Sequence, residues 1–154
     1  MESSAGSTPT RVLVVAHKTA ATPTLLDAVR ERAARGPAVF TLLVPNAAHG
    51  LHRVVDPEDQ TAGEAEQMIE LAVPLLEEAA GGPVEGIVGD PSPMDAIADI
   101  VNARGFDEVI LSTLPARVSK WLKLDLPSKV TGLGLPVTVV TPSGATSSEP
   151  AGAA

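Results

Sequence analysis

Cysteine is absent from this sequence of 154 residues, and the aromatic residues are limited to Phe40, Phe106 and Trp121. Without cysteine the chain can form neither disulfides nor the thiolate sites of zinc, iron–sulfur clusters and thiol-dependent enzymes. So few aromatic rings also leave no stacking platform for single-stranded nucleic acid. The net charge of −8 further disfavours a protein that binds nucleic acid duplexes.

Long apolar runs are missing as well. No stretch approaches the roughly 20 apolar residues of a membrane helix, and Met1–Thr10 lacks the basic and apolar regions of a secretory signal. We therefore expect a cytoplasmic protein.

Residues 1–10 and 142–154 are mostly Ser, Gly, Ala, Thr and Pro, which predicts two disordered tails around one domain, residues 11–141.

Strand and helix patterns alternate between the predicted tails. Runs rich in valine and leucine predict buried strands, and amphipathic segments with helix-capping signals follow them. Short apolar strands joined by helices form a parallel sheet with helices on both faces, so we predict an α/β fold. The predicted strands are 11–16, 38–44, 84–88, 107–113 and 136–141; the predicted helices are 23–35, 58–80 and 93–104, with one or two short helices in 116–135.

Several motifs that are common on such sheets are absent. The first strand is not followed by G-x-G-x-x-G, and neither G-x-x-x-x-G-K-[ST] nor G-x-S-x-G occurs. In an open parallel sheet, ligands bind beyond the carboxyl ends of the strands, where the winding direction reverses. The candidate site therefore consists of the loops 17–21, 45–56, 89–92 and 114–126.

The charges are unevenly distributed. Residues 56–108 contain 14 acidic residues and a single basic one, whereas residues 117–129 contain Arg117, Lys120, Lys123 and Lys129 against one acidic residue. Because this basic stretch follows the fourth strand, it is suited to a phosphate-bearing small molecule. The alternative is that these long side chains coat an irregular segment or pair with the acidic helices.

Polar residues and a glycine also follow the strands. His17 is a candidate ligand-facing group or general base, or a hydrogen-bonded structural histidine. Gly89 allows close approach of a ligand to the backbone, or a tight turn into the next helix. We expect no catalytic or metal-ligating residue; the expected ligand-binding residues are His17, Lys18, Thr19, Val44, Gly89, Asp90, Ser112, Thr113, Arg117 and Lys120.

The chain resembles the universal stress protein family in the segments RVLVVA (11–16), GDP (89–91), DEVILST (107–113) and LPVTVV (135–140). The resemblance extends over residues 11–141. It implies a three-layer, Rossmann-like or flavodoxin-like fold whose five parallel strands have the order 3-2-1-4-5. It also implies a homodimer formed through the last strand, Pro136–Thr141. Many members of the family bind ATP or AMP, and others bind no nucleotide.

The chain departs from the pattern of the nucleotide-binding members. Those members carry Asp after the first strand, where His17 stands here, and G-x-x-G-(nine residues)-G-[ST] after the fourth strand. Residues 112–115 (STLP) and Asp125-Leu126 stand at the glycine positions. Pro115 has no N–H to donate, and the Asp125 carboxylate repels phosphate. We therefore do not expect ATP to be held in the family's usual way.

Three functions remain open at this point. The first is a homodimeric regulatory protein that binds an adenine nucleotide or another anionic ligand between the first and fourth strands. The second is an enzyme for a phosphorylated substrate, with His17 as the base and Ser112, Thr113 or Lys120 in contact with the substrate. The third is a ligand-free module that binds a protein partner through its acidic helices or its dimer surface.

Overall fold

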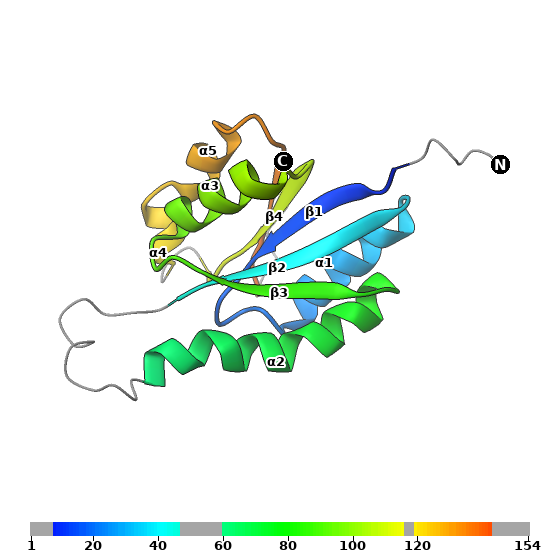
Figure 1. Cartoon of the computed structure of the whole chain (residues 1–154), viewed down its shortest axis with the longest axis horizontal. Helices are drawn as coiled ribbons and strands as arrows, with labels where there is room; N and C mark the ends of the chain where they lie inside the picture. The colour runs from blue at the N-terminus through cyan, green and yellow to red at the C-terminus, as the bar shows by residue number, and fades with distance from the viewer. Residues whose placement is uncertain (1–7, 47–59, 116–118, 143–154) are drawn as a thin grey trace.

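The computed structural model describes residues 8–46, 60–115 and 119–142. Most of both predicted tails, residues 1–7 and 143–154, lies outside these ranges. Five parallel strands form one sheet in the order β3-β2-β1-β4-β5, which confirms the predicted fold class and strand order (Figure 1). The elements in chain order are β1 (Thr10–Val15), α1 (Pro23–Ala34), β2 (Ala38–Pro45), α2 (Gln60–Ala80), β3 (Val84–Gly89), α3 (Pro93–Arg104), β4 (Glu108–Ser112), α4 (Lys120–Lys123), α5 (Leu126–Thr131) and β5 (Val137–Val140).

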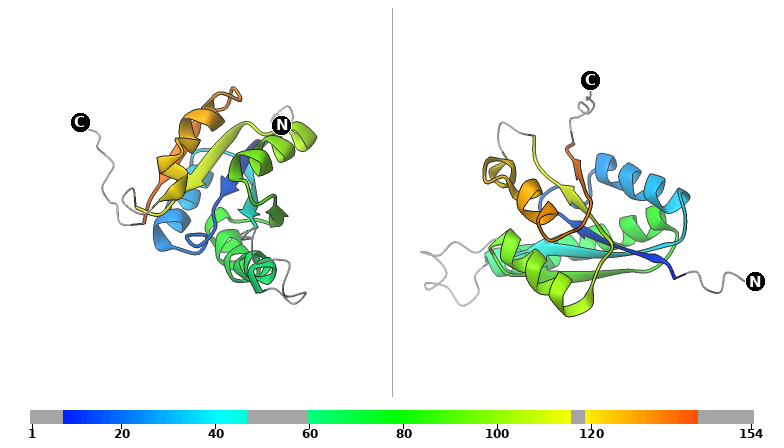
Figure 2. Two further views of the ribbon diagram at one scale, coloured as in Figure 1. Left: turned by 90° about the vertical axis from the view of Figure 1, so that its left-hand side faces the viewer. Right: turned by 90° about the horizontal axis from the view of Figure 1, so that it is seen from above.

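Helices cover both faces of the sheet. Helices α1 and α2 lie on one side, and α3, α4 and α5 lie on the other (Figure 2). Since successive side chains of a strand point to opposite faces, β1 supplies both layers of the core. Val12 and Val14 belong to the core cluster with α1 and α2, whereas Leu13 and Val15 pack with α3 and α5. Among the described helices, none combines the length and apolar character needed to cross a membrane.

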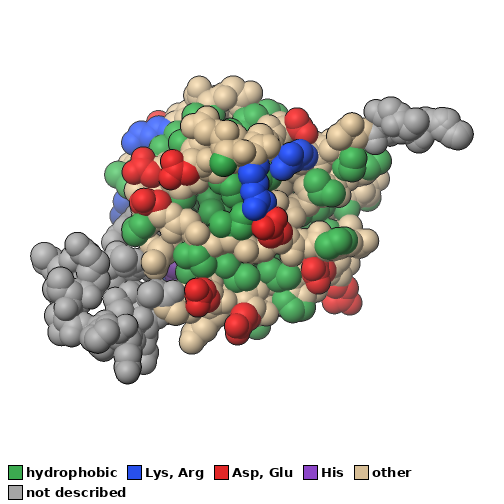
Figure 3. Space-filling view, viewed as in Figure 1, with side chains coloured by type: hydrophobic (Ala, Val, Ile, Leu, Met, Phe, Trp, Pro, Cys, Tyr) green, Lys and Arg blue, Asp and Glu red, His purple; other side chains and the backbone are tan. Residues whose placement is uncertain are grey.

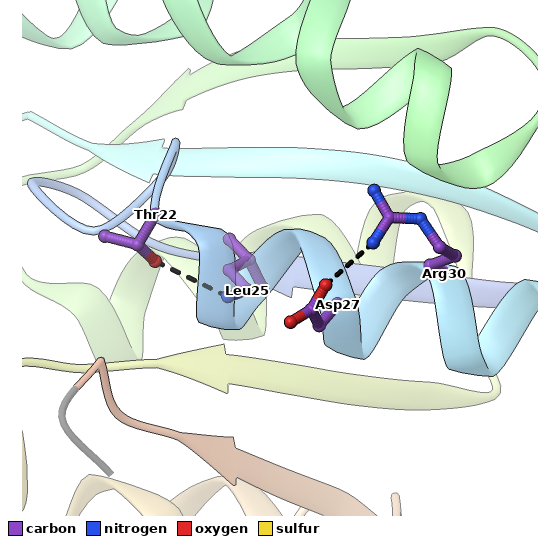
Figure 4. A network of polar contacts seen from close by, with 4 residues as sticks. All are labelled: Thr22, Leu25, Asp27 and Arg30. Carbon is purple, nitrogen blue, oxygen red and sulfur yellow. Dashed lines mark hydrogen bonds and ion pairs between the residues drawn. The ribbon is translucent and has the colours of Figure 1, made fainter. Parts of the chain in front are cut away.

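Two helices begin directly after loops at the carboxyl edge of the sheet. The hydroxyl of Thr22 accepts a hydrogen bond from the Leu25 N–H at 3.4 Å, and Pro23 opens α1 (Figure 4). Asp27 and Arg30 form an exposed ion pair one turn later, which contributes little to stability. Ser92 caps α3 in the same way through the Asp95 N–H. The first turns of α1 and α3 therefore flank the edge where a ligand is expected.

The apolar stripe of α2 is largely as the sequence predicts, since Ala72, Leu76 and Ala79 are buried, but one of its residues is placed differently. The apolar stripe of this helix predicts that Leu71 points inward, but the Leu71 side chain is 57% exposed. Ile69 and Val73 face the sheet instead, because Gly86 on β3 has no side chain and admits them. Leu71, two residues from each along the helix, is thereby turned toward solvent.

Candidate functional site

The winding direction of the sheet reverses between β1 and β4, which pair side by side. Hydrogen bonds to the outer neighbours extend both β1 and β4 by one residue. The Ala16 N–H donates to Leu43 O of β2 at 3.1 Å, and the Thr113 N–H donates to Val140 O of β5 at 2.8 Å. The segments that begin at His17 and Leu114 therefore leave the sheet next to each other. This is the carboxyl edge at which ligands of open parallel sheets bind.

Buried hydroxyls gather in the segments that follow β1 and β4. The buried polar residues of the described ranges are Thr19, Ser112, Thr113 and Ser119, each at most 3% exposed. The Thr19 and Ser112 hydroxyls lie 2.6 Å apart, and Thr19 Oγ1 also donates to Ser112 O at 3.2 Å. The Thr113 hydroxyl donates to Leu114 O, and the Ser119 hydroxyl accepts from the Leu122 N–H. The Thr19–Ser112 pair thus ties the two segments together, whereas the other two hydroxyls make local bonds.

Two polar atoms at the same edge lack partners. His17 Nε2, after β1, and Asn46 Oδ1, after the neighbouring β2, are buried and have no hydrogen-bond partner among residues 8–46, 60–115 and 119–142. A buried polar atom left without a hydrogen bond costs about 1–3 kcal/mol. A ligand with polar groups at this edge would recover that cost.

The imidazole of His17 loses its proton more readily than an exposed imidazole does, because its pKa is lowered. Its burial lowers the pKa from 6.5, Glu64 on α2 opposes this effect, and the neighbouring Lys18 adds to it. The uncharged ring offers one donor and one acceptor nitrogen. A negatively charged group placed beside it would raise the pKa and stabilise the protonated ring.

Gly89 and Asp90 have roles within the fold. A Cβ at Gly89 would lie 2.8 Å from Ala96 Cβ on α3 and 2.8 Å from Leu43 Cδ1 on β2, so the glycine allows α3 to pack closely on the sheet. Asp90 Oδ1 accepts a hydrogen bond from the Ser92 N–H at 2.9 Å and fixes the turn into α3. These contacts account for the GDP segment without a ligand.

The remaining expected site residues do not form one cluster in the described structure. Lys18 is exposed beside His17. Val44 is fully buried in the core cluster that packs against α1 and α2. Arg117 lies outside the described residues. Lys120 opens α4, and its side chain lies outside the described part. In the ranges that the structure covers, no cluster of His, Asp and Glu is suited to hold a metal ion.

Asp125 adopts a backbone conformation typical of glycine. Its φ of 58° and ψ of 40° are left-handed, and no other non-glycine residue of the described ranges has a positive φ. The resemblance assigns a family glycine to this position. The aspartate therefore keeps the turn that leads into α5 but adds a carboxylate to it.

Sequence reasoning did not single out Asn46 or Glu64. Asn46 is the first residue after β2, just as His17 is a polar residue that follows β1. This shared position after a buried strand is the signal that could have identified Asn46. Glu64 raises the pKa of His17 through its charge although it belongs to α2, a distant part of the chain, so this influence depends on the fold.

Replacing Thr19 by valine should lower the free energy of unfolding by about 1–2 kcal/mol, because it leaves the buried Ser112 hydroxyl without its partner. Thr131→Val is the matched control, since the Thr131 hydroxyl is exposed and donates within its own helix. We expect the control to change stability by less than about 0.5 kcal/mol. Urea denaturation measures both; equal effects of the two variants would contradict the role of the Thr19–Ser112 bond.

Neither a family model nor a curated protein matches the sequence. Solved structures do match. A universal stress protein from Archaeoglobus fulgidus has a TM-score of 0.63 at 16% identity, covering 88% of this chain and 96% of that one. The chain has the universal stress protein fold.

Two further neighbours were solved with nucleotides. A universal stress protein family protein from Arabidopsis thaliana with AMP bound has a TM-score of 0.60 at 17% identity and covers 94% of this chain and 100% of its own. A universal stress protein in complex with cAMP has a TM-score of 0.59 at 16% identity and covers 87% of this chain and 98% of its own. At these identities the likeness establishes the fold.

Proposed function

We propose that this protein is a regulatory protein of the universal stress type that binds an adenine nucleotide at the carboxyl edge of β1 and β4. The observation that carries the proposal is a pair of unpartnered buried atoms at the carboxyl edge of the sheet: His17 Nε2 after β1, and Asn46 Oδ1 after the neighbouring β2. Neighbours with the same fold were solved with AMP or cAMP, and this supports the choice of ligand.

A nucleotide with one phosphate fits the edge better than ATP does. The polar atoms that lack partners follow β1 and β2, whereas Pro115 and Asp125 stand where the resemblance expects phosphate-binding glycines. Proline offers no N–H, and a carboxylate repels each added phosphate. We therefore expect AMP and cAMP to bind more tightly than ATP, a ranking that isothermal titration of the purified chain measures directly.

The affinity for cAMP should rise as the pH is lowered from about 6.5, the ordinary pKa of histidine, to more acidic values. Burial lowers the pKa of His17 in the free protein, and a phosphate beside it raises this pKa, so binding takes up a proton. Each unit of pKa increase strengthens binding by up to about tenfold. Titrations at several pH values measure this effect, and cAMP suits them because its phosphodiester does not itself titrate there.

The His17→Ala variant is the control for this pH dependence. This variant should bind cAMP more weakly than the unaltered chain at low pH. Its affinity should also stay the same at every pH of the series. An unchanged pH profile in the variant would contradict the assignment of His17 to the site.

A second candidate function is a ligand-free module that binds a protein partner, and it is compatible with the Thr19 and Ser112 hydroxyls at the carboxyl edge, which need no ligand. These hydroxyls satisfy one another across the point where the sheet reverses. A ligand at 100 times its dissociation constant adds about 2.7 kcal/mol of stability. Absence of any thermal shift with AMP, cAMP and ATP would favour this module over the nucleotide-binding protein.

We further propose a homodimer formed through β5, within the predicted segment Pro136–Thr141. β5 is an edge strand, and Val139 is 42% exposed on it. An uncovered apolar edge strand pairs readily with a second copy about a two-fold axis. Pairing two copies of β5 would cover this edge.

Substituting Val139 by lysine should convert the dimer to a monomer, because two copies of the strand would bring like charges together in an apolar interface. Sedimentation equilibrium at micromolar concentration measures the mass. Val39→Lys is the matched control, since Val39 is 47% exposed on β2, away from the β5 edge. A monomeric unaltered chain, or a dimeric Val139→Lys variant, would contradict the interface.

A further inference from the structure

A concave surface lies at the amino-terminal edge of the sheet, opposite to the carboxyl edge. It has a volume of about 450 Å³ and is formed by the starts of β1, β2 and β3 together with the end of α3. This volume is within the usual range of small-molecule sites, roughly 300–1,000 Å³. The residues that give the groove its character are Arg11, Val39, Thr41, Glu85, Arg104 and Phe106.

The groove is open because α3 is too short to cover this end of the sheet. Arg11 pairs in register with Val39, and Thr41 with Glu85. These side chains point to the same face as Leu13 and Leu43, which α3 and α5 do cover. Beyond the last residue of α3 the floor is uncovered, and Val39 is 47% exposed on it.

Arg11 is held in position by an aromatic ring. Its guanidinium carbon lies 5.3 Å from the centre of the Phe106 ring, within the range of a cation–π interaction. No carboxylate in the part of the chain that the structure describes forms an ion pair with this guanidinium. A fixed guanidinium has its N–H edge available for the two oxygens of a carboxylate.

Two oppositely charged residues of the groove, Arg104 and Glu85, neutralise each other. Arg104 binds Glu85 with both terminal nitrogens, at 2.7 and 3.0 Å. Among the residues that line the groove, Arg11 is therefore the cation without an anionic partner, in a chain whose net charge is −8. The nearby Asp107 carboxylate accepts a hydrogen bond from the Arg11 main-chain N–H at 2.8 Å and not from the guanidinium. Figure 3 looks onto this side of the sheet, where basic and acidic side chains meet beside exposed hydrophobic surface.

We propose that this groove binds a small aromatic monocarboxylate, at a site separate from the carboxyl edge. The carboxylate pairs with the Arg11 guanidinium, and the flat apolar body rests on Val39 beside Phe106. One negative charge matches the single unneutralised cation, and the apolar floor favours a ring over a phosphate. This ligand class follows from the chemistry of the groove and does not depend on nucleotide binding.

The probe for the test is 2-naphthoate, titrated into the full chain and followed by saturation-transfer NMR. With about 13 non-hydrogen atoms, it should bind with a dissociation constant of about 1 mM or less. The uncharged 2-naphthamide should bind at least about tenfold more weakly, the loss expected for one charge-assisted hydrogen-bonded pair. Saturating AMP should leave naphthoate binding unchanged, because the two sites lie at opposite edges of the sheet.

Arg11→Gln should weaken naphthoate binding at least about tenfold, because it removes the charge and the paired N–H edge. Arg30→Gln is the matched control: it removes one positive charge from α1, on the other face of the sheet, and should leave binding unchanged. Circular dichroism confirms that both variants are folded. The proposal is overturned if naphthoate does not saturate, if the amide binds as well, if Arg11→Gln binds normally, or if AMP displaces the probe.

Discussion

Replacing Leu13 by alanine is expected to lower the free energy of unfolding by about 2–5 kcal/mol, the largest effect among the variants considered for this protein. Leu13 lies at the centre of the sheet, between β2 and β4, with no exposed surface. Its side chain packs in the core cluster beneath α3 and α5. Alanine would remove buried methyl groups and leave a cavity that these rigid neighbours cannot fill.

Leu71→Ala provides the matched control for this variant. It is the same chemical change on α2, where the leucine side chain is 57% exposed. The control should change stability by less than about 0.5 kcal/mol, because little apolar surface is uncovered. Urea denaturation with a common slope measures the two values. A cost at Leu71 as large as that at Leu13 would show that the orientation of α2 described above is wrong.

Replacing Gly89 by valine should destabilise the protein by about 3 kcal/mol, the upper end of the range for overpacking. Even a single Cβ at this position would lie 2.8 Å from both Ala96 and Leu43. Ala96 belongs to α3 and Leu43 to the centre of the sheet, so neither can move aside cheaply. The substitution should also displace the first turn of α3, and with it the carboxyl edge.

The control for Gly89→Val is Gly82→Val. A Cβ at Gly82 meets no atom within 4 Å, and its backbone is not in the left-handed region. We expect a change of less than about 1 kcal/mol there. Thermal unfolding monitored by circular dichroism compares the two. If Gly89→Val is as stable as Gly82→Val, then the close packing of α3 on the sheet is wrong.

The sequence was sufficient for the α/β class because the buried strands consist of valine and leucine, and because Thr22 and Ser92 mark the starts of helices. The strand order came from the resemblance, and the structure confirms it. Most of the apolar stripe of α2 was predicted, but the exposure of Leu71 was not, since it depends on how Ile69 and Val73 pack against Gly86, a residue of another element.

The candidate site was predicted in part. His17 stands at the edge where it was expected, and Thr19 and Ser112 are brought together there from 93 residues apart. Asn46 was not singled out, because its place on the strand next to that of His17 depends on the pairing of β1 with β2. The groove at the opposite edge was also missed: the end of α3 was predicted, but the face of the sheet that Arg11 occupies is a property of the packed structure.

The most direct test of nucleotide binding at the carboxyl edge is an NMR titration with cAMP that follows the imidazole of His17. The sequence has three histidines, and the His17 signal is the one missing from the His17→Ala spectrum. We predict a saturable shift of this signal and a higher pKa in the bound protein, because the phosphate stabilises the protonated ring. A His17 signal that neither shifts nor changes its pKa at saturating cAMP would contradict the proposed site.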